Sequence, residues 1–279
     1  TKPSTFYELV QLMGLSHGTD VWKGNAQELI RNQTCTLKNV IGCRDSIMTY
    51  LINCGLENKA AFDIMERVRK GRGLLPEQEK AMRDSNVPDW YIESCKKIKY
   101  MFPKAHAAAY AISSLRIAWF KVYYPEEYYC AFFSIRADEF DGEMMLSSLD
   151  NIIKQRKELY DGFSKRKQKE QAQYYLLELV EEMYRRGITF DPISIEKSHS
   201  HRFLKTQHGK ILPPLNTIPS VSTAMAESIV RARDEKPFKT RDDLSKRSGI
   251  GPSTIDKIAT FGIIDHLPES EQIDLFSLF

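Results

Sequence analysis

Short helical segments that end at glycine or proline fill most of this 279-residue chain and limit the folds open to it. Apolar residues recur at helical spacing, whereas strand-type alternation is confined to ITFDPISI and HRFLKTQHGKILPP. Pro213 and Pro214 then mark a boundary before a compact helical unit. The sequence therefore predicts a mainly α fold, in which a helical first domain precedes a small α/β linker region and a helical last unit.

Helix limits are expected where capping residues, glycine and proline occur. Asn25 is expected to cap the helix AQELIRN, and the stretch TLKNVIGCRDSIMTYLINCGL is expected to be one helix that ends at Gly55. Residues 141–186 are expected to form two connected helices, of which the first is basic. Further helices are expected from Lys104 to Tyr123 and from Pro125 to Ile135.

Composition excludes several classes of protein. Hydrophobic content is 42% and charged content 28%, as in ordinary globular proteins. No apolar run approaches the ~20 residues that span a bilayer, and TKPSTFYELV is no signal peptide. The five cysteines form no CxxC pair, so we expect reduced thiols and no zinc site in a cytoplasmic protein. The missing initiator methionine indicates a processed chain or an excised fragment.

The net charge is only +3, but basic residues gather locally. Seven bases face two acids between Lys154 and Lys169, and Lys96, Lys97, Lys99 and Lys104 form a second cluster. Basic stripes on a nearly neutral chain are typical of a protein that contacts a polyanion along one face. A solvated charged face explains the same pattern equally well.

The stretch FPKAHAAAY, residues 102–110, combines features of a triphosphate site. Pro103 favours a helix start, where free N–H groups and the helix dipole attract phosphate. Lys104 adds a charge there, His106 adds a donor on which Tyr110 can stack, and the alanines leave room for a flat base. The alternative is a packed helix whose alanines permit close helix contact, with Lys104 in solvent.

FPKAHAAAY and its neighbours VPDWYIESCKKIKYM and RIAWFKVYYPEEYYCAFFSIRADEFD closely resemble the fingers region of the PolC-type bacterial replicative DNA polymerase III of low-GC Gram-positive bacteria. The upstream stretch GLSHGTDVWKGNAQELI is similar to the same fingers, and the resemblance covers essentially the whole chain. It implies that Lys104 and His106 face the incoming dNTP and the template. Further nucleotide contacts are then expected at Ser16, His17 and Gly18 across the pocket, at Tyr110, and at Lys97 and Arg116.

A polymerase also needs paired carboxylates that hold two Mg²⁺ ions for phosphoryl transfer. In the family that this chain resembles, those acids belong to the palm, which would precede Thr1. The acidic runs ADEFDGE and RDDL do not match the palm motif, and His199 and His201 are expected at the surface. We therefore expect no catalytic residue and no bound metal in this chain, which alone should be inactive, whereas the intact polymerase should use Mg²⁺.

Residues 215–235 and 244–264 both have the pattern helix, tight turn, helix, and together they resemble a tandem helix-hairpin-helix unit. In the second copy, Gly249 and Gly251 let backbone N–H groups bind a phosphate without reading sequence, while Ile250 enters the core. Ser220 and Ser222 replace both glycines in the first copy, which leaves its DNA contact open. Added contacts to the duplex are expected from Ser253, Arg231, Arg233, Lys246 and Lys257.

The chain ends in SEQIDLFSLF, a polar segment followed by exposed apolar side chains. Such a terminus is typical of a peptide that fills a groove on a partner. Gln272, Ile273, Asp274, Leu275 and Phe276 resemble the bacterial pentapeptide that binds the sliding clamp, the β subunit of the polymerase. The alternative is a tail that folds back onto its own domain.

These expectations divide the chain into four parts. We expect fingers at 1–141, connecting helices and short strands at 142–214, the duplex-binding hairpins at 215–268 and the clamp-binding tail at 269–279. The expected function is that of a DNA polymerase part, whose partners are primer–template DNA, dNTP, the clamp and other replisome subunits, without a membrane. The alternative is a non-catalytic adaptor that links duplex DNA to the clamp, although FPKAHAAAY would have no use in it.

Overall fold

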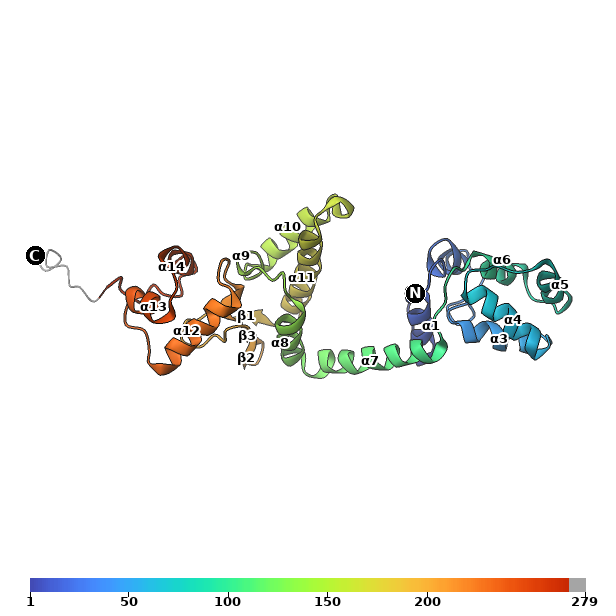
Figure 1. The fold of residues 1–279 in the computed structure, drawn as a ribbon, viewed down its shortest axis with the longest axis horizontal. Helices are drawn as coiled ribbons and strands as arrows, with labels where there is room; N and C mark the ends of the chain where they lie inside the picture. The colour runs from blue at the N-terminus through green and yellow to red at the C-terminus, as the bar shows by residue number, and fades with distance from the viewer. Residues whose placement is uncertain (271–279) are drawn as a thin grey trace, which may run out of the picture. The chain divides into compact units, whose positions relative to one another are not determined.

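The computed structural model describes residues 1–270 and divides into two compact units, the first covering Thr1–Ala118 and the second beginning at Trp119 (Figure 1). The division falls inside helix α7 (Lys104–Tyr123), and each unit has its own core. Helices dominate both units, which confirms the mainly α expectation. No helix within residues 1–270 is long and apolar enough to cross a membrane.

The first unit is a set of short helices around one apolar core. Ile47 and Leu51 of α3, Ile64 of α4 and Ile92 of α6 are fully buried there. Burial of each such side chain contributes about 1.5–3 kcal/mol. Its elements are α1 (Phe6–His17), a π-type turn (Trp22–Ala26), α2 (Gln27–Arg31), α3 (Arg44–Asn53), α4 (Asn58–Arg69), α5 (Pro76–Asp84) and α6 (Asp89–Lys97).

The prediction of one long helix ending at Gly55 was wrong for its first half, because α3 begins only at Arg44. The preceding residues pass close to α1 instead. The amide of the buried Gln11 donates to the Val40 carbonyl at 2.8 Å and binds this loop to the helix. A contact between residues so far apart in sequence outweighs the local helical pattern.

The capping role expected for Asn25 was also wrong. Its buried side chain accepts from Ser94 Oγ at 2.7 Å and donates to the carbonyls of Ser94 and Asp20. Asn25 therefore fastens the π-type turn to α6 rather than starting a helix.

Gly14 lies where α1 and the following loop nearly touch, and this close approach gives a test of the packing. A Cβ added at Gly14 would lie 2.2 Å from the Gly42 carbonyl oxygen, so backbone must move. We expect Gly14→Ala to lower the free energy of unfolding of the first unit by about 3 kcal/mol, measured by urea denaturation. Gly24→Ala is the control: its Cβ would meet nothing within 4 Å, and only the strain of φ 71° costs about 1 kcal/mol. Equal losses would contradict this packing.

The second unit begins with the end of α7 and with α8 (Pro125–Arg136), whose Tyr129 and Phe133 share a core with Leu177 of α11 and Ile211 of the sheet. This shared core sets the boundary between the compact units at Trp119, whereas the functional division expected at residue 142 stays a prediction. The region 141–186 holds three helices instead of two: α9 (Gly142–Met145), α10 (Leu149–Tyr160) and α11 (Gln168–Arg185).

A three-stranded sheet follows α11 at the two places where the sequence shows strand-type alternation. Its order is β1-β3-β2, with β1 parallel and β2 antiparallel to the central β3. The strands are β1 (Thr189–Phe190), β2 (Leu204–Gln207) and β3 (Lys210–Leu212).

The last helices of the second unit surround a separate apolar cluster. Ile229 of α12, Leu244 of α13 and Ile258 of α14 are fully buried in it. The compact helical unit predicted after Pro213 and Pro214 is therefore present, and Ile193 and Ile195 from before these prolines also join its cluster. Its elements are a 3-10 turn (Leu215–Thr217), α12 (Thr223–Glu235), α13 (Arg241–Ser248) and α14 (Pro252–Ala259).

Candidate nucleic-acid interface

The two hairpins share one backbone conformation although their sequences differ. Ser220 has φ 74° where Gly249 has φ 71°. Two residues later, Ser222 (φ −69°, ψ 161°) and Gly251 (φ −70°, ψ 159°) are the N-caps of α12 and α14. A non-glycine residue at positive φ is strained, so the first hairpin keeps the turn at a cost in free energy.

The residue between the two turn positions anchors each hairpin. Val221 is 4% exposed and Ile250 is 3% exposed, and both lie in the same apolar cluster. The core position expected for Ile250 is therefore confirmed, and Val221 is its counterpart.

The hairpins differ in what they offer to an anion. The hydroxyl of Ser222 accepts from the Met225 N–H at 3.2 Å, so the first hairpin caps its own helix. Gly251 has no side chain to do this, and a Cβ added at Gly249 or Gly251 would meet nothing within 4 Å. The backbone at the start of α14, with the exposed Ser253, is thus open to an incoming phosphate.

Several acidic side chains lie beside the first hairpin. Ser220 and Ser222 line a pocket of about 430 Å³ together with Asp138, Glu139 and Asp141. Carboxylates that line the same pocket repel a phosphate group, although Lys169 also lines it and lies 3.8 Å from Glu139. The first hairpin is therefore the weaker candidate for DNA contact.

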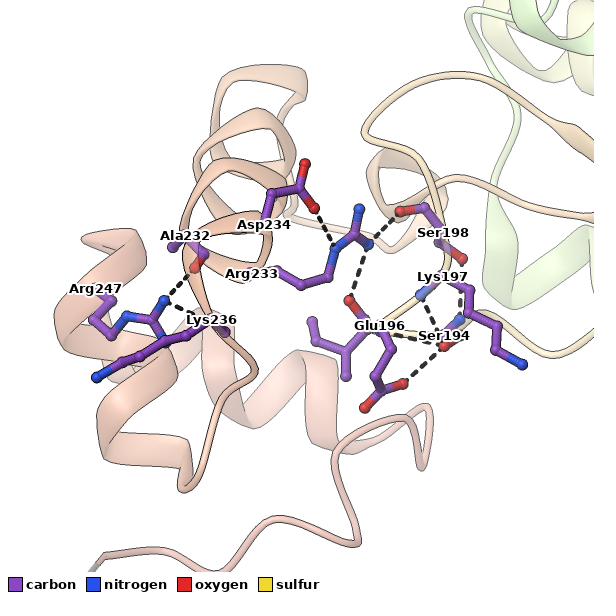
Figure 2. A network of polar contacts seen from close by, with 10 residues as sticks. Ser194, Glu196, Lys197, Ser198, Ala232, Arg233, Asp234, Lys236 and Arg247 are labelled. Atoms are coloured by element: carbon purple, nitrogen blue, oxygen red, sulfur yellow. Dashed lines mark hydrogen bonds and ion pairs between the residues drawn. The ribbon is translucent and has the colours of Figure 1, made fainter.

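The basic residues near the hairpins fall into two groups. Arg231 and Lys246 are exposed, whereas Lys257 Nζ lies 3.4 Å from Glu143 Oε2 and is partly neutralised. Arg233, which was expected to add charge for DNA, is instead bound within the protein. Its guanidinium donates to the Ser198 carbonyl at 2.7 Å (Figure 2) and to the Ile195 carbonyl at 3.1 Å, and so holds the preceding loop.

In the first unit, four rings gather between the end of α1 and the start of α7. His17 stacks on Tyr110 with centroids 5.7 Å apart, and His106 stacks on Phe102 at 4.9 Å. His106 also meets Tyr110 edge to face at 4.8 Å, and His17 meets Phe102 at 5.5 Å. His106 and Tyr110 are exposed, so this ring cluster presents flat faces and imidazole nitrogens to a ligand.

Lys104 does not lie with that ring cluster. Its Nζ is 4.9 Å from the centroid of the Tyr7 ring, and it lines a pocket of about 410 Å³ between α1 and α3. Its backbone N–H donates to Asp45 Oδ2 at 2.6 Å. A carboxylate therefore already occupies part of the helix N-terminus that was expected to bind phosphate.

The three alanines of FPKAHAAAY differ in their surroundings. Ala107 is buried against Val10 and Cys43 and Ala108 packs partly on the same cluster, whereas Ala109 is exposed, so close helix contact accounts for only part of the run. Burial, with a further effect from Asp45, raises the pKa of the Cys43 thiol to about 11. This thiol is therefore neutral at ordinary pH.

The remaining predicted nucleotide contacts are dispersed. Ser16 Oγ donates to the Met13 carbonyl at 3.1 Å and lies 2.9 Å from His17 Nδ1, which orients that ring. Gly18 is tightly packed, since an added Cβ would lie 2.9 Å from the Tyr100 carbonyl oxygen. Lys97 Nζ donates to the Gly24 carbonyl at 3.0 Å, and Arg116 is exposed on α7.

One ring of the cluster, Phe102, is absent from the sequence-based predictions. The sequence signal was its position directly before Pro103 and Lys104, where an aromatic side chain closes the turn into α7. The predicted clamp-binding residues, Gln272 to Phe276, lie outside the described residues.

No three metal-ligating side chains come together within residues 1–270. His199 and His201 lie with their ring centroids 4.8 Å apart but have no third ligand. Partial burial lowers the pKa of His199, and the neighbouring His201 lowers it further by a smaller amount.

Comparison with known proteins finds family matches for two segments of the chain. Residues 1–87 match the bacterial DNA polymerase III alpha subunit finger domain, and residues 187–273 match the helix-hairpin-helix motif. The PolC-type DNA polymerase III of Staphylococcus epidermidis is 48% identical over 278 residues, and that of Lacticaseibacillus paracasei is 50% identical over 277. These alignments cover 100% and 99% of this chain but only 19% of each relative.

Proposed function

We propose that this chain, which belongs to the PolC-type DNA polymerase III family, grips the primer–template duplex of a replicative DNA polymerase and forms one side of its nucleotide site. The observation that carries the proposal is the open backbone at Gly249 and Gly251 above the start of α14. A phosphate bound there would accept hydrogen bonds from backbone N–H groups and face the positive end of the helix dipole. Such contacts fix a duplex in place without reading its sequence.

Equal affinity for unrelated sequences is the expected signature of this grip. The chain would be titrated into two labelled primer–template duplexes of the same length and unrelated sequence, and binding followed by fluorescence anisotropy. We expect dissociation constants within about threefold of each other, because phosphate contacts carry no sequence information. A preference of about a thousandfold, typical of base readout, would contradict the proposal.

The ring cluster supports a nucleotide contact on the fingers side. His17, His106 and Tyr110 come from two helices yet meet at one exposed place, where the rings can stack on a base and the imidazoles can donate to a phosphate. The adaptor alternative has no need for this cluster. Saturation-transfer NMR with a dNTP should show contacts that His106→Ala and Tyr110→Leu remove. Contacts unchanged by both substitutions would contradict this assignment.

The terminal pentapeptide is proposed as the attachment to the sliding clamp. Its apolar pair, Leu275 and Phe276, would fill a groove while Gln272 donates a hydrogen bond. A pull-down with purified clamp should retain the chain, and the double substitution Leu275→Ala with Phe276→Ala should abolish retention. Retention of the double variant would show that the clamp is bound elsewhere.

The isolated chain is proposed to be inactive in primer extension. Phosphoryl transfer by two metal ions needs clustered carboxylates, and no such cluster occurs in the described part of the chain. A gel assay with primer–template, all four dNTPs and Mg²⁺ should show no extended product. Extension by the purified chain would overturn this proposal.

A further inference from the structure

The end of the α10–α11 hairpin carries lysines and exposed tyrosines that the duplex grip and the nucleotide site leave unused. Tyr160 is 65% exposed and Tyr175 is 59% exposed. Lys157, Lys165 and Lys167 are exposed between and beside them. We call these five residues the tip surface. Exposed aromatic rings that gather with basic side chains at one place are typical of a surface that binds single-stranded nucleic acid.

The tip surface rests on a rigid support. Phe163 packs edge to face on Tyr174 at 5.0 Å and on Tyr175 at 5.7 Å, and Tyr160 lies 6.0 Å from Tyr174. The Gln171 amide donates to the Phe163 and Arg166 carbonyls at 3.3 and 2.9 Å and closes the turn. The two exposed tyrosines are therefore held in place before any ligand arrives, which lowers the entropic cost of binding.

The tip surface carries three lysines beside the exposed acids Glu158 and Asp161, so its net charge is modestly positive. Within the described chain, Lys157, Lys165 and Lys167 form no ion pair with an acidic side chain. The nearby Glu170 and Glu181 are instead paired with Arg166 at 2.9 Å and with Arg156 at 2.7 Å. A polyanion that approaches the hairpin end thus meets positive charge and two aromatic faces.

We infer that the tip surface binds single-stranded DNA. Lysines bind phosphates of single and double strands alike, but only an unpaired strand has bases free to stack on exposed rings. A duplex would leave Tyr160 and Tyr175 without a partner. The choice of a single strand rests on the tip surface itself, whereas the choice of DNA over RNA rests on the proposed polymerase function.

The test uses the full 279-residue chain and a labelled 20-nucleotide oligothymidylate, with anisotropy followed across salt concentrations. The triple variant Lys157→Gln, Lys165→Gln, Lys167→Gln should reduce the slope of log K against log[salt] by about 2, since each single-strand phosphate contact contributes about 0.7. The control variant Lys2→Gln, Lys59→Gln, Lys197→Gln changes the net charge equally at exposed lysines elsewhere and should leave the slope unchanged.

The tyrosines separate stacking from simple attraction. Tyr160→Leu and Tyr175→Leu should each weaken single-strand binding by roughly tenfold, while Tyr→Phe at the same positions should retain it. Unchanged binding in the leucine variants, or an equal loss in the control lysine variant, would overturn the inference. Failure of the proposed function would appear differently, as absent duplex binding by the unaltered chain.

Discussion

Gly251→Asp should abolish most duplex binding while leaving the fold slightly more stable. At φ −70° and with nothing within 4 Å of the added Cβ, any side chain fits there. An aspartate would cap α14 and raise the free energy of unfolding by about 0.5 kcal/mol. Its charge would also occupy the place of the phosphate, which should weaken duplex binding by roughly tenfold or more. Anisotropy and urea denaturation measure the two opposite effects.

Two further variants locate the contact. Gly251→Asn caps the helix without a charge and should weaken binding less. Ser222→Asp places the same charge at the matching position of the first hairpin, where Asp138 and Asp141 already repel phosphate, and should change affinity by less than about threefold. If Ser222→Asp weakened duplex binding as much as Gly251→Asp does, both hairpins, or neither, would contact the duplex through their turns.

Arg247→Met should destabilise the last helices more than any substitution of an exposed base near them. The Arg247 guanidinium donates to the carbonyls of Ala232 and Lys236 at the end of α12 (Figure 2). It also pairs with Asp243 at 3.3 Å and lies over the Phe238 ring at 5.0 Å. Methionine keeps the aliphatic contact but leaves those carbonyls without their donor. We expect the free energy of unfolding of the last helices to fall by about 3 kcal/mol.

Amide hydrogen exchange of α12 measures this loss locally, which matters because two compact units need not unfold together. The substitution Lys246→Met at the adjacent exposed lysine is the control. It should change the free energy of opening measured by exchange by less than about 0.5 kcal/mol. Arg247→Lys should behave like the methionine variant, since one ammonium cannot reach several carbonyls. Full protection in Arg247→Met would contradict the role assigned to this arginine.

The hairpins were predictable from the sequence because their determinants are local. Ile250 and the turn glycines lie within three consecutive residues, and the apolar cluster that they join is built from neighbouring helices. Even the serine-containing first hairpin kept its turn, since Val221 supplies the same buried anchor. Local pattern was enough to predict the path of the backbone in this region.

Contacts between distant segments were not predictable in the same way. Arg233 reads as a free positive charge, but carbonyls of residues 195 and 198 bind it. Lys104 and His106 are two residues apart in one motif, yet they face different surroundings once α7 packs against α1. The sequence therefore supplied candidate residues in the fingers, whereas the partners of each side chain required the three-dimensional structure.

The central claim, that this chain grips duplex DNA through phosphates, is tested most directly by its salt dependence. A labelled primer–template duplex would be titrated with the chain by fluorescence anisotropy at several salt concentrations. We predict binding whose log K falls linearly with log[salt], with a slope near −0.9 for each phosphate contacted, and a shallower slope for Gly251→Asp. No binding at low salt, or binding unaffected by salt, would contradict the account.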